Sequence, residues 1–293
     1  MAVILGLLLV VTFIANYLTT TLPNTMGQND LAHEAQVQDQ VAQLGGVMLI
    51  AAQQGAIGAQ ISGPISLGSA GAPPFAGQDP STITPLANRS LYTVGFSLTG
   101  PTPWLNLSYA TRGTSCGTSF CAGAGFVVHL RNTYATSGEV AYEQGAVVYA
   151  QSGGIPIFVS TPPITFTNGI LSIFLPRFSN NTVNTESGVG TADLNLRLLS
   201  AAPVVVPGNG FSFRSGTFVT ATIQSAYAAA WYAYYHSLTA LAPDVTCTPT
   251  GASSPCTANY VTGGPLGTVT LKVPISAITT LDFLVGVYSF AMS

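Results

Sequence analysis

The first 22 residues carry no charged side chain, and this run constrains the chain more than any other segment. The run reads MAVILGLLLVVTFIANYLTTTL, and twelve of its positions are Val, Ile, Leu or Phe. A helix of about 20 apolar residues spans the hydrocarbon core of a bilayer. A secretory signal peptide has instead a basic start, a shorter apolar stretch and a cleavage site of small residues. The run therefore predicts a membrane anchor, or a processed N-terminus whose basic leader has been removed.

The next segment continues the helix with a different character. Residues 29–54 contain no turn signal before Gly55. Pro23 interrupts the junction and predicts a kink there, because proline lacks an N–H donor. Apolar residues recur at steps of three and four along one stripe, at Val37, Val41, Leu44, Met48 and Ala51. Residues 1–54 are therefore expected to form one bent helix, about 80 Å long at 1.5 Å per residue.

The remaining chain changes its period. Residues 55–85 are rich in Gly, Ala, Ser and Pro, which predicts a linker or a surface loop. Residues 86–293 contain short runs of β-branched and aromatic residues punctuated by Gly, Pro and Asn, which predicts a β-sandwich. The alanine-rich stretch SAYAAAWYAYYHSL, Ser225 to Leu238, predicts one short helix. The predicted fold class is α+β, with a long N-terminal helix followed by a mainly β-sandwich domain.

The low charge of the chain excludes two classes of partner. Charged residues make up 6% of the sequence, against about 25% in an average soluble domain. No window contains even three basic residues, and Lys272 is the single lysine. Nucleic-acid binding needs clustered Lys and Arg, and so does a polybasic membrane-surface patch. We therefore expect no nucleic-acid partner.

Cysteines and sequons favour an extracellular location. The four cysteines form two close pairs in Gly/Ser/Thr/Pro-rich segments, with spacings wider than those of zinc ligands. Two local disulfides are the favoured interpretation, and these imply an oxidising compartment. Three N-glycosylation sequons agree with it. The residues concerned are Cys116, Cys121, Cys247 and Cys256 for the disulfides, and Asn88, Asn106 and Asn180 for glycosylation.

The acidic residues suggest no enzyme. Glu139 and Glu143 would share one face of a strand, but about 13 Å would separate them. This distance exceeds the carboxylate spacing of glycosidases. No HExxH motif and no phosphate-binding glycine loop occurs. The sequence therefore predicts no catalytic residue, no metal ligand and no cofactor, and a glycosidase pair from distant segments is the weakest alternative.

Histidines and aromatic residues also have structural interpretations. His33, on the long helix, is expected to pack in a filament or face solvent. His236 lies near a helix C-terminus, where it interacts favourably with the helix dipole, and His129 lies within a predicted strand. The aromatic cluster of the short helix, Trp231 to Tyr235, is expected to pack across a sheet and less often to form a sugar platform.

Four stretches carry a family resemblance. The apolar run leading into NDLAHEAQVQDQVAQLGG resembles the N-terminal segment of archaeal type IV pilins and pilin-like proteins. The later stretches GEVAYEQGAVVYAQSGG, PPITFTNGILSIFLPRF and VTATIQSAYAAAWYAYY are similar in order and character to the globular part of euryarchaeal pilin-like proteins. Bacterial pilins keep a glutamate at the fifth mature position, where this chain has Leu5, and archaeal relatives often lack that acid.

The resemblance implies a structural filament subunit with no enzymatic activity. Its partners would be copies of itself, the membrane before assembly and covalently attached glycans, and it would function in adhesion at the cell surface. Gly6, Gly27, Gly45 and Gly46 would allow close backbone approach between helices. The expected filament-core residues are Val3, Ile4, Leu7, Leu8, Val11, Ile14, Leu18, Val37, Val41, Leu44 and Met48.

Two other functions remain open at this point. One is an archaellin, the subunit of a rotary swimming filament, which the sequence does not separate from a pilin. The other is a membrane-anchored, lectin-like binding module that does not polymerise.

Overall fold

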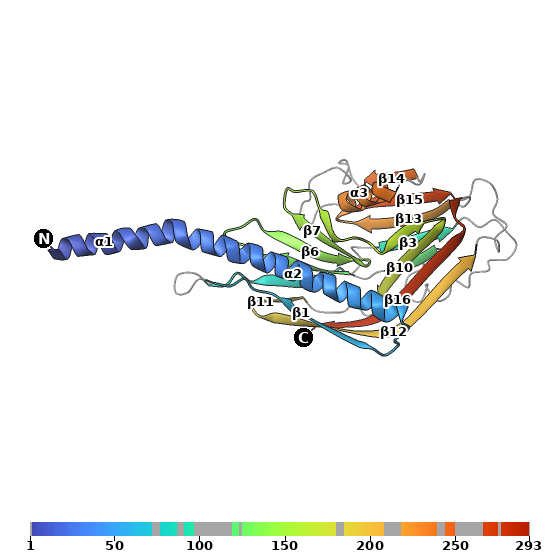
Figure 1. Ribbon diagram of the computed structural model, residues 1–293, viewed down its shortest axis with the longest axis horizontal. Helices are drawn as coiled ribbons and strands as arrows, with labels where there is room; N and C mark the ends of the chain where they lie inside the picture. Colours follow the sequence, from blue (N-terminus) through green and yellow to red (C-terminus); the bar gives the residue numbers. More distant parts are fainter. Residues whose placement is uncertain are drawn as a thin grey trace.

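A computed structural model shows a long helix that projects from a strand-rich domain (Figure 1). It describes residues 2–71, 77–86, 91–96, 119–122, 125–179, 185–207, 218–238, 244–249, 266–274 and 277–292. One end of the helix is free, and the other runs along the sheets. The predicted α+β class is confirmed.

The helix is continuous but changes its hydrogen bonding in the middle. It consists of α1 (Ala2–Asn16), a π-helical turn (Tyr17–Thr21) and α2 (Leu22–Gln53). The backbone N–H of Leu22 donates to the carbonyl of Tyr17, five residues earlier. Pro23 follows at once, and its ring would clash with the carbonyl one α-helical turn earlier. The wider turn relieves this clash, and the helix axis bends there (Figure 1).

Three sheets form the described part of the domain. The first sheet has the order β1 (Gln60–Ser66), β12 (Thr191–Pro207), β16 (Thr280–Met292), β10 (Ile170–Phe178), β9 (Ile164–Thr167). The second sheet has the order β11 (Glu186–Gly188), β2 (Ser81–Pro85), β5 (Gly125–Leu130), β6 (Gly138–Glu143), β7 (Ala146–Gln151), β8 (Ile157–Ser160). The third has the order β14 (Asp244–Pro249), β15 (Gly267–Pro274), β13 (Phe218–Ser225), β3 (Leu91–Phe96), β4 (Ser119–Ala122).

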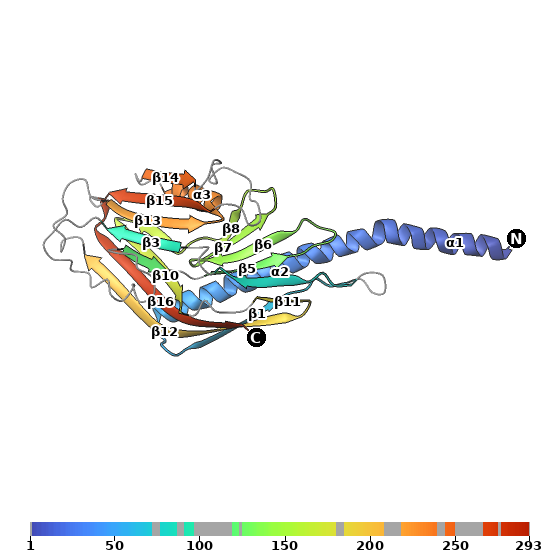
Figure 2. The ribbon, with the colours of Figure 1, turned by 180° about the vertical axis from the view of Figure 1, so that it is seen from behind.

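The first sheet contributes to two cores. Phe174 and Phe178 of β10 pack in a core with α2 and the second sheet. Leu171 and Ile173, which alternate with them along the strand, pack in a core with the third sheet and α3 (Ala228–Leu238). Alternate residues of a strand point to opposite faces, so the first sheet is apolar on both faces. Figure 2 shows the three sheets and the helix from behind.

Two-residue turns with positive φ close two of the hairpins. Gln144 and Gly145 (φ 53° and 87°) join β6 to β7, and Asn168 and Gly169 (φ 53° and 80°) join β9 to β10. Positive φ at both turn residues is the type I′ pattern, whose twist matches that of the paired strands. Residues 138–151 therefore form a hairpin.

The structure corrects one expectation about the domain. The predicted linker, residues 55–85, contains β1 and β2, and β1 pairs with β12 along its whole length. Ile61 and Ile65 of β1 are buried against α2, so their apolar burial outweighs the turn-forming composition around them. The described part of the domain contains three sheets. The short helix is confirmed as α3, which begins three residues later than predicted.

Candidate functional site

The free end of the helix exposes its apolar side chains. Exposed fractions run from 84% at Val3 to 40% at Leu18. No Asp, Glu, Lys or Arg lies before Asp30. The long helix is apolar enough to cross a membrane, and its most apolar 18-residue window is entirely unburied. The exposed large side chains are Val3, Ile4, Leu5, Leu7, Leu8, Leu9, Val10, Val11, Phe13, Ile14 and Leu18.

This exposed surface covers all sides of the helix. Large apolar residues stand at consecutive positions from Leu7 to Val11, and Leu5 lies on the other side of Gly6. A surface helix of a globular protein has one apolar stripe, whereas a helix that is apolar all round is buried in a protein core or in lipid. The side chains from Val3 to Leu18 therefore need either lipid or other protein around them.

The second half of the helix is the core of its own domain. Val37, Val41, Leu44 and Met48 are 0–3% exposed and pack against residues of the first and second sheets. The Tyr288 hydroxyl on β16 donates to the Met48 carbonyl over 2.5 Å. These four residues, which the sequence assigned to a filament core, are enclosed by sheets of the same chain. The predicted residues from Val3 to Leu18 remain free of such contacts.

Two polar contacts hold α2 at the point where it leaves the domain. Asp30 is fully buried, and its Oδ2 accepts the backbone N–H groups of Tyr134 and Ala135 over 3.2 and 3.3 Å. The adjacent Asn29 side-chain amide donates to the Ala70 carbonyl over 2.8 Å. These bonds fix both the β5–β6 loop and the segment after β1 to the helix. The direction in which α1 projects is therefore set by the domain.

A second pair of contacts fixes the helix to β1. The His33 Nε2 atom lies 3.1 Å from the Ser66 carbonyl, and the Gln40 Oε1 atom accepts the Ser66 N–H over 2.9 Å. His33 is 4% exposed. The expectation that it packs in a filament or faces solvent is wrong, because the end of β1 lies over it.

Glu34 is a buried carboxylate beside this anchor. It is 8% exposed, and burial raises its pKa, while the Tyr149 hydroxyl nearby offsets part of that effect. Burial and the Glu34 carboxylate both raise the pKa of Tyr149. Glu34 Oε1 accepts a hydrogen bond from the Gln38 side-chain amide over 3.4 Å, whereas Oε2 has no partner within the geometric limits among the described residues. Glu34 lies within the folded domain, about four helical turns beyond Leu18, where the exposed apolar stretch ends.

The sequence did not assign a role to Glu143, which joins two sheets. It is 1% exposed on β6, and its Oε2 accepts the Trp231 indole N–H over 2.6 Å and the Ser225 hydroxyl over 2.7 Å. Glu139 shares its face, as the strand period predicted. Two carboxylates four apart in an apolar strand are the signal that could have indicated buried partners, since charged groups are rarely buried without them.

The aromatic residues of α3 pack mainly inward. Trp231 and Tyr235 are fully buried between α3 and the third sheet, as predicted for a helix packed across a sheet. The Tyr234 hydroxyl donates to the carbonyls of Pro162 and Ile164, so its polar end is also engaged. His236 lies in the last turn of α3, in edge contact with the Tyr232 ring at 4.5 Å.

Most predicted disulfide and glycosylation positions lie outside the described residues. These are Cys116, Cys256, Asn88, Asn106 and Asn180. Cys121 lies in β4, and Cys247 in β14 is disulfide-bonded. The pairing of the cysteines and the occupancy of the sequons stay predictions.

Comparison with known proteins adds no identity. The chain matches no protein-family model, no curated protein and no solved structure. Within the described ranges, no three His, Cys, Asp or Glu side chains lie together as a metal-ion site would require. The features that indicate a function are therefore the exposed apolar helix and the contacts by which the domain holds it.

Proposed function

We propose that this chain is a structural subunit of an extracellular filament of the archaeal type IV pilus kind, used for surface attachment. Copies of the exposed apolar helix, from Val3 to Leu18, would pack together in the filament core. The single observation that carries the proposal is the contrast within one helix. Its first part is apolar and uncovered on all sides, and its second part is locked into the domain.

The energetics favour a covered helix. Eleven large apolar side chains are exposed along it, and each is worth roughly 1.5–3 kcal/mol when fully buried. Covering them contributes on the order of 17–33 kcal/mol, an upper estimate because the side chains are 40–84% exposed in the helix. Lipid supplies this burial before assembly, and neighbouring helices would supply it afterwards. The transfer from membrane to filament then leaves no apolar surface in water.

The fixed geometry of the anchor favours a regular polymer. Each domain holds its own helix at one angle through Asp30, His33 and the buried stripe. Identical subunits joined by a heterologous contact that does not close form an open helical filament. The strand-rich domains would lie on the outside, where glycans and disulfides are tolerated. A rotary archaellin filament would use the same packing.

The test is electron microscopy of material sheared from cells that express the chain. Continuous filaments composed of this polypeptide are expected. The double substitution Leu8→Asp and Val11→Asp should abolish them, because two carboxylates would be buried without partners. Ile157→Asp is the matched control, since Ile157 is 57% exposed on the edge strand β8 of the domain.

The outcomes separate the candidate functions. Filaments that persist in the double variant would overturn the proposal, as would material sheared from wild-type cells that contains only dispersed single subunits. The second result would assign the chain as a membrane-anchored binding module. Near-ultraviolet circular dichroism of the variants checks that the domain remains folded. If cells that carry the double variant lose swimming but keep surface attachment, the chain would be assigned as an archaellin.

A further inference from the structure

An open polar hollow lies across one end of the second sheet. Its volume is about 490 Å³, within the range of ligand-binding pockets. β11, β2, β5, β6 and β7 or the residues next to them contribute to its lining. The lining is mostly Ser, Thr, His, Arg and Glu, and it differs from the apolar faces elsewhere in the domain. The side chains used below are Thr82, His129, Arg131, Glu139, Ser152 and Ser187.

A registered row of side chains forms the floor of this hollow. Ser187 pairs with Thr82, Thr82 with His129, His129 with Glu139, and Glu139 with Ala150. Directly paired residues project to the same face of a sheet. Strands are about 4.8 Å apart, so the accessible part of the row, from Ser187 to His129, extends roughly 10 Å over three strands, and Glu139 and Ala150 at the other end are buried. The floor suits an elongated ligand that lies perpendicular to the strands.

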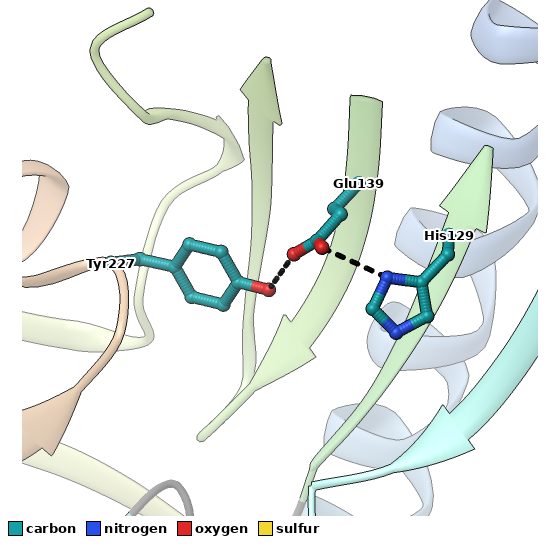
Figure 3. A network of polar contacts seen from close by, with 3 residues as sticks. All are labelled: His129, Glu139 and Tyr227. Atoms are coloured by element: carbon teal, nitrogen blue, oxygen red, sulfur yellow. Dashed lines mark hydrogen bonds and ion pairs between the residues drawn. The ribbon is translucent and has the colours of Figure 1, made fainter. Parts of the chain in front are cut away.

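A buried network fixes the centre of the row (Figure 3). Glu139 is 5% exposed, and its Oε1 lies 2.8 Å from His129 Nδ1. From the other side, the buried Tyr227 hydroxyl donates to Glu139 Oε2 over 3.1 Å. Both carboxylate oxygens are therefore engaged, and His129 Nδ1 carries the hydrogen that it shares with Glu139. The His129 ring is held with Nε2 remaining for a ligand, and its side chain is 39% exposed.

The free charge in the hollow is positive. Arg131 lies two residues beyond His129, is exposed, and makes no hydrogen bond or ion pair with the part of the chain that the structure describes. Glu139 is the one carboxylate of the lining and is engaged below the surface. The hydroxyls of Thr82, Ser152 and Ser187 surround these groups. A guanidinium without a partner can bind a carboxylate through two parallel hydrogen bonds. The surrounding hydroxyls can hydrogen-bond to the hydroxyls of a sugar.

We infer that this hollow binds a carboxylate-bearing oligosaccharide, such as a chain of uronic acids. Arg131 binds the carboxylate, His129 Nε2 bonds to a sugar hydroxyl, and the row from Ser187 to Glu139 orients the chain across the strands. Glu139 acts as a positioning residue through His129. The inference goes beyond the proposed filament and does not require it, since one subunit holds the whole site.

The experiment is titration calorimetry on the full chain in detergent micelles. The probe is an oligogalacturonate of four sugars, and its methyl ester is the uncharged comparison. We expect saturable binding of the acid form, at least about tenfold tighter than of the ester, because a charged hydrogen bond is replaced. Arg131→Gln should weaken binding of the acid form at least about tenfold, and Thr82→Val should weaken it severalfold.

The matched control is Arg197→Gln. Arg197 is exposed on β12 in the first sheet, outside the hollow, and its substitution removes the same charge. Its affinity for the probe should equal that of the wild type. No binding of the acid form, equal binding of the ester, or equal loss in the Arg131 and Arg197 variants would each overturn the inference. The titration uses single subunits, so the binding result can be interpreted even if the chain forms no filament.

Discussion

The Tyr142 ring lies directly against the backbone of Gly45. A Cβ atom built on Gly45 would stand 2.9 Å from Tyr142 Cε2, closer than any ordinary contact. Tyr142 is fully buried and stacks with Phe126 and Phe178 at 5.6 and 6.4 Å between ring centres. The ring therefore has little room to move. This contact sets how closely α2 approaches the second sheet.

The neighbouring glycine gives a matched comparison. We expect Gly45→Ala to lower the free energy of unfolding by about 1–3 kcal/mol, because the core must shift. Gly46 has nothing within 4 Å of its Cβ position. Gly46→Ala should therefore raise the free energy of unfolding by roughly 0.5–1 kcal/mol, because alanine favours the helix. Urea unfolding of both variants measures the difference, and equal effects would contradict the assigned contact.

Removing the charge of Glu143 should weaken the link between the second sheet and α3. In Glu143→Gln, one donor of the new amide group would face the Trp231 and Ser225 donors. We expect the free energy of unfolding to fall by about 1–3 kcal/mol, as for a buried polar group left without its partner. Glu186→Gln on β11 is the control. It removes a carboxylate from a short, partly exposed strand, and it should change stability by less than about 0.5 kcal/mol.

Glu34 should make the domain less stable as the pH rises. Its folded pKa is raised above the ordinary value of 4.5. Below that value both states are protonated and there is no cost. As the pH rises through 4.5, the unfolded chain ionises first, so the free energy of unfolding falls until the pH passes the folded pKa. The loss then persists at neutral pH.

The substitution Glu34→Gln removes this loss. At pH 7 we expect it to raise the free energy of unfolding by on the order of 1 kcal/mol, and to flatten the pH profile above 4.5. Asp39→Asn, at an exposed carboxylate of the same helix, should keep the wild-type profile. Urea unfolding between pH 3 and 7 measures all three proteins. A Glu34→Gln profile that still falls with pH would show that another group is responsible.

The cysteines should pair locally. Cys247 is disulfide-bonded, and we expect Cys256 to be its partner and Cys116 to pair with Cys121. Mass spectrometry of a digest without reductant identifies the linked peptides. A peptide linking Cys247 to Cys116 or Cys121 would contradict this pairing. Cys247→Ser should then lower stability by about 2–4 kcal/mol, a typical value for a lost disulfide.

Local sequence patterns predicted the elements that are determined by residues close together in the sequence. The uncharged run, the effect of Pro23 and the alanine-rich helix follow from composition and spacing over a few residues. The stripe from Val37 to Met48 was also recognised, because its period is that of a helix. The surface that covers this stripe was not predicted, because a periodic apolar stripe shows only that something covers it. Sheets of the same chain and helices of another subunit leave the same pattern.

Long-range pairing accounts for what the sequence left undetermined. β10 and β16 pair in parallel although more than 100 residues separate them, and no local signal specifies that register. The turn-rich composition before residue 85 obscured β1, which its partner β12 stabilises. The row from Ser187 to Glu139 likewise combines three separate regions of the chain. His129 and Glu139 appeared as isolated residues because only the sheet places them side by side.

The burial of α2 has a mechanical consequence. Tension applied to the projecting helix acts along the helix axis, and the core around Val41, Leu44 and Met48 resists it as shear along its length. The load is shared among many side-chain contacts and the Tyr288–Met48 hydrogen bond at once, so no single contact has to break first. Withdrawing the helix would also remove the centre of the domain. The apolar end therefore cannot be pulled free without unfolding the domain that carries it.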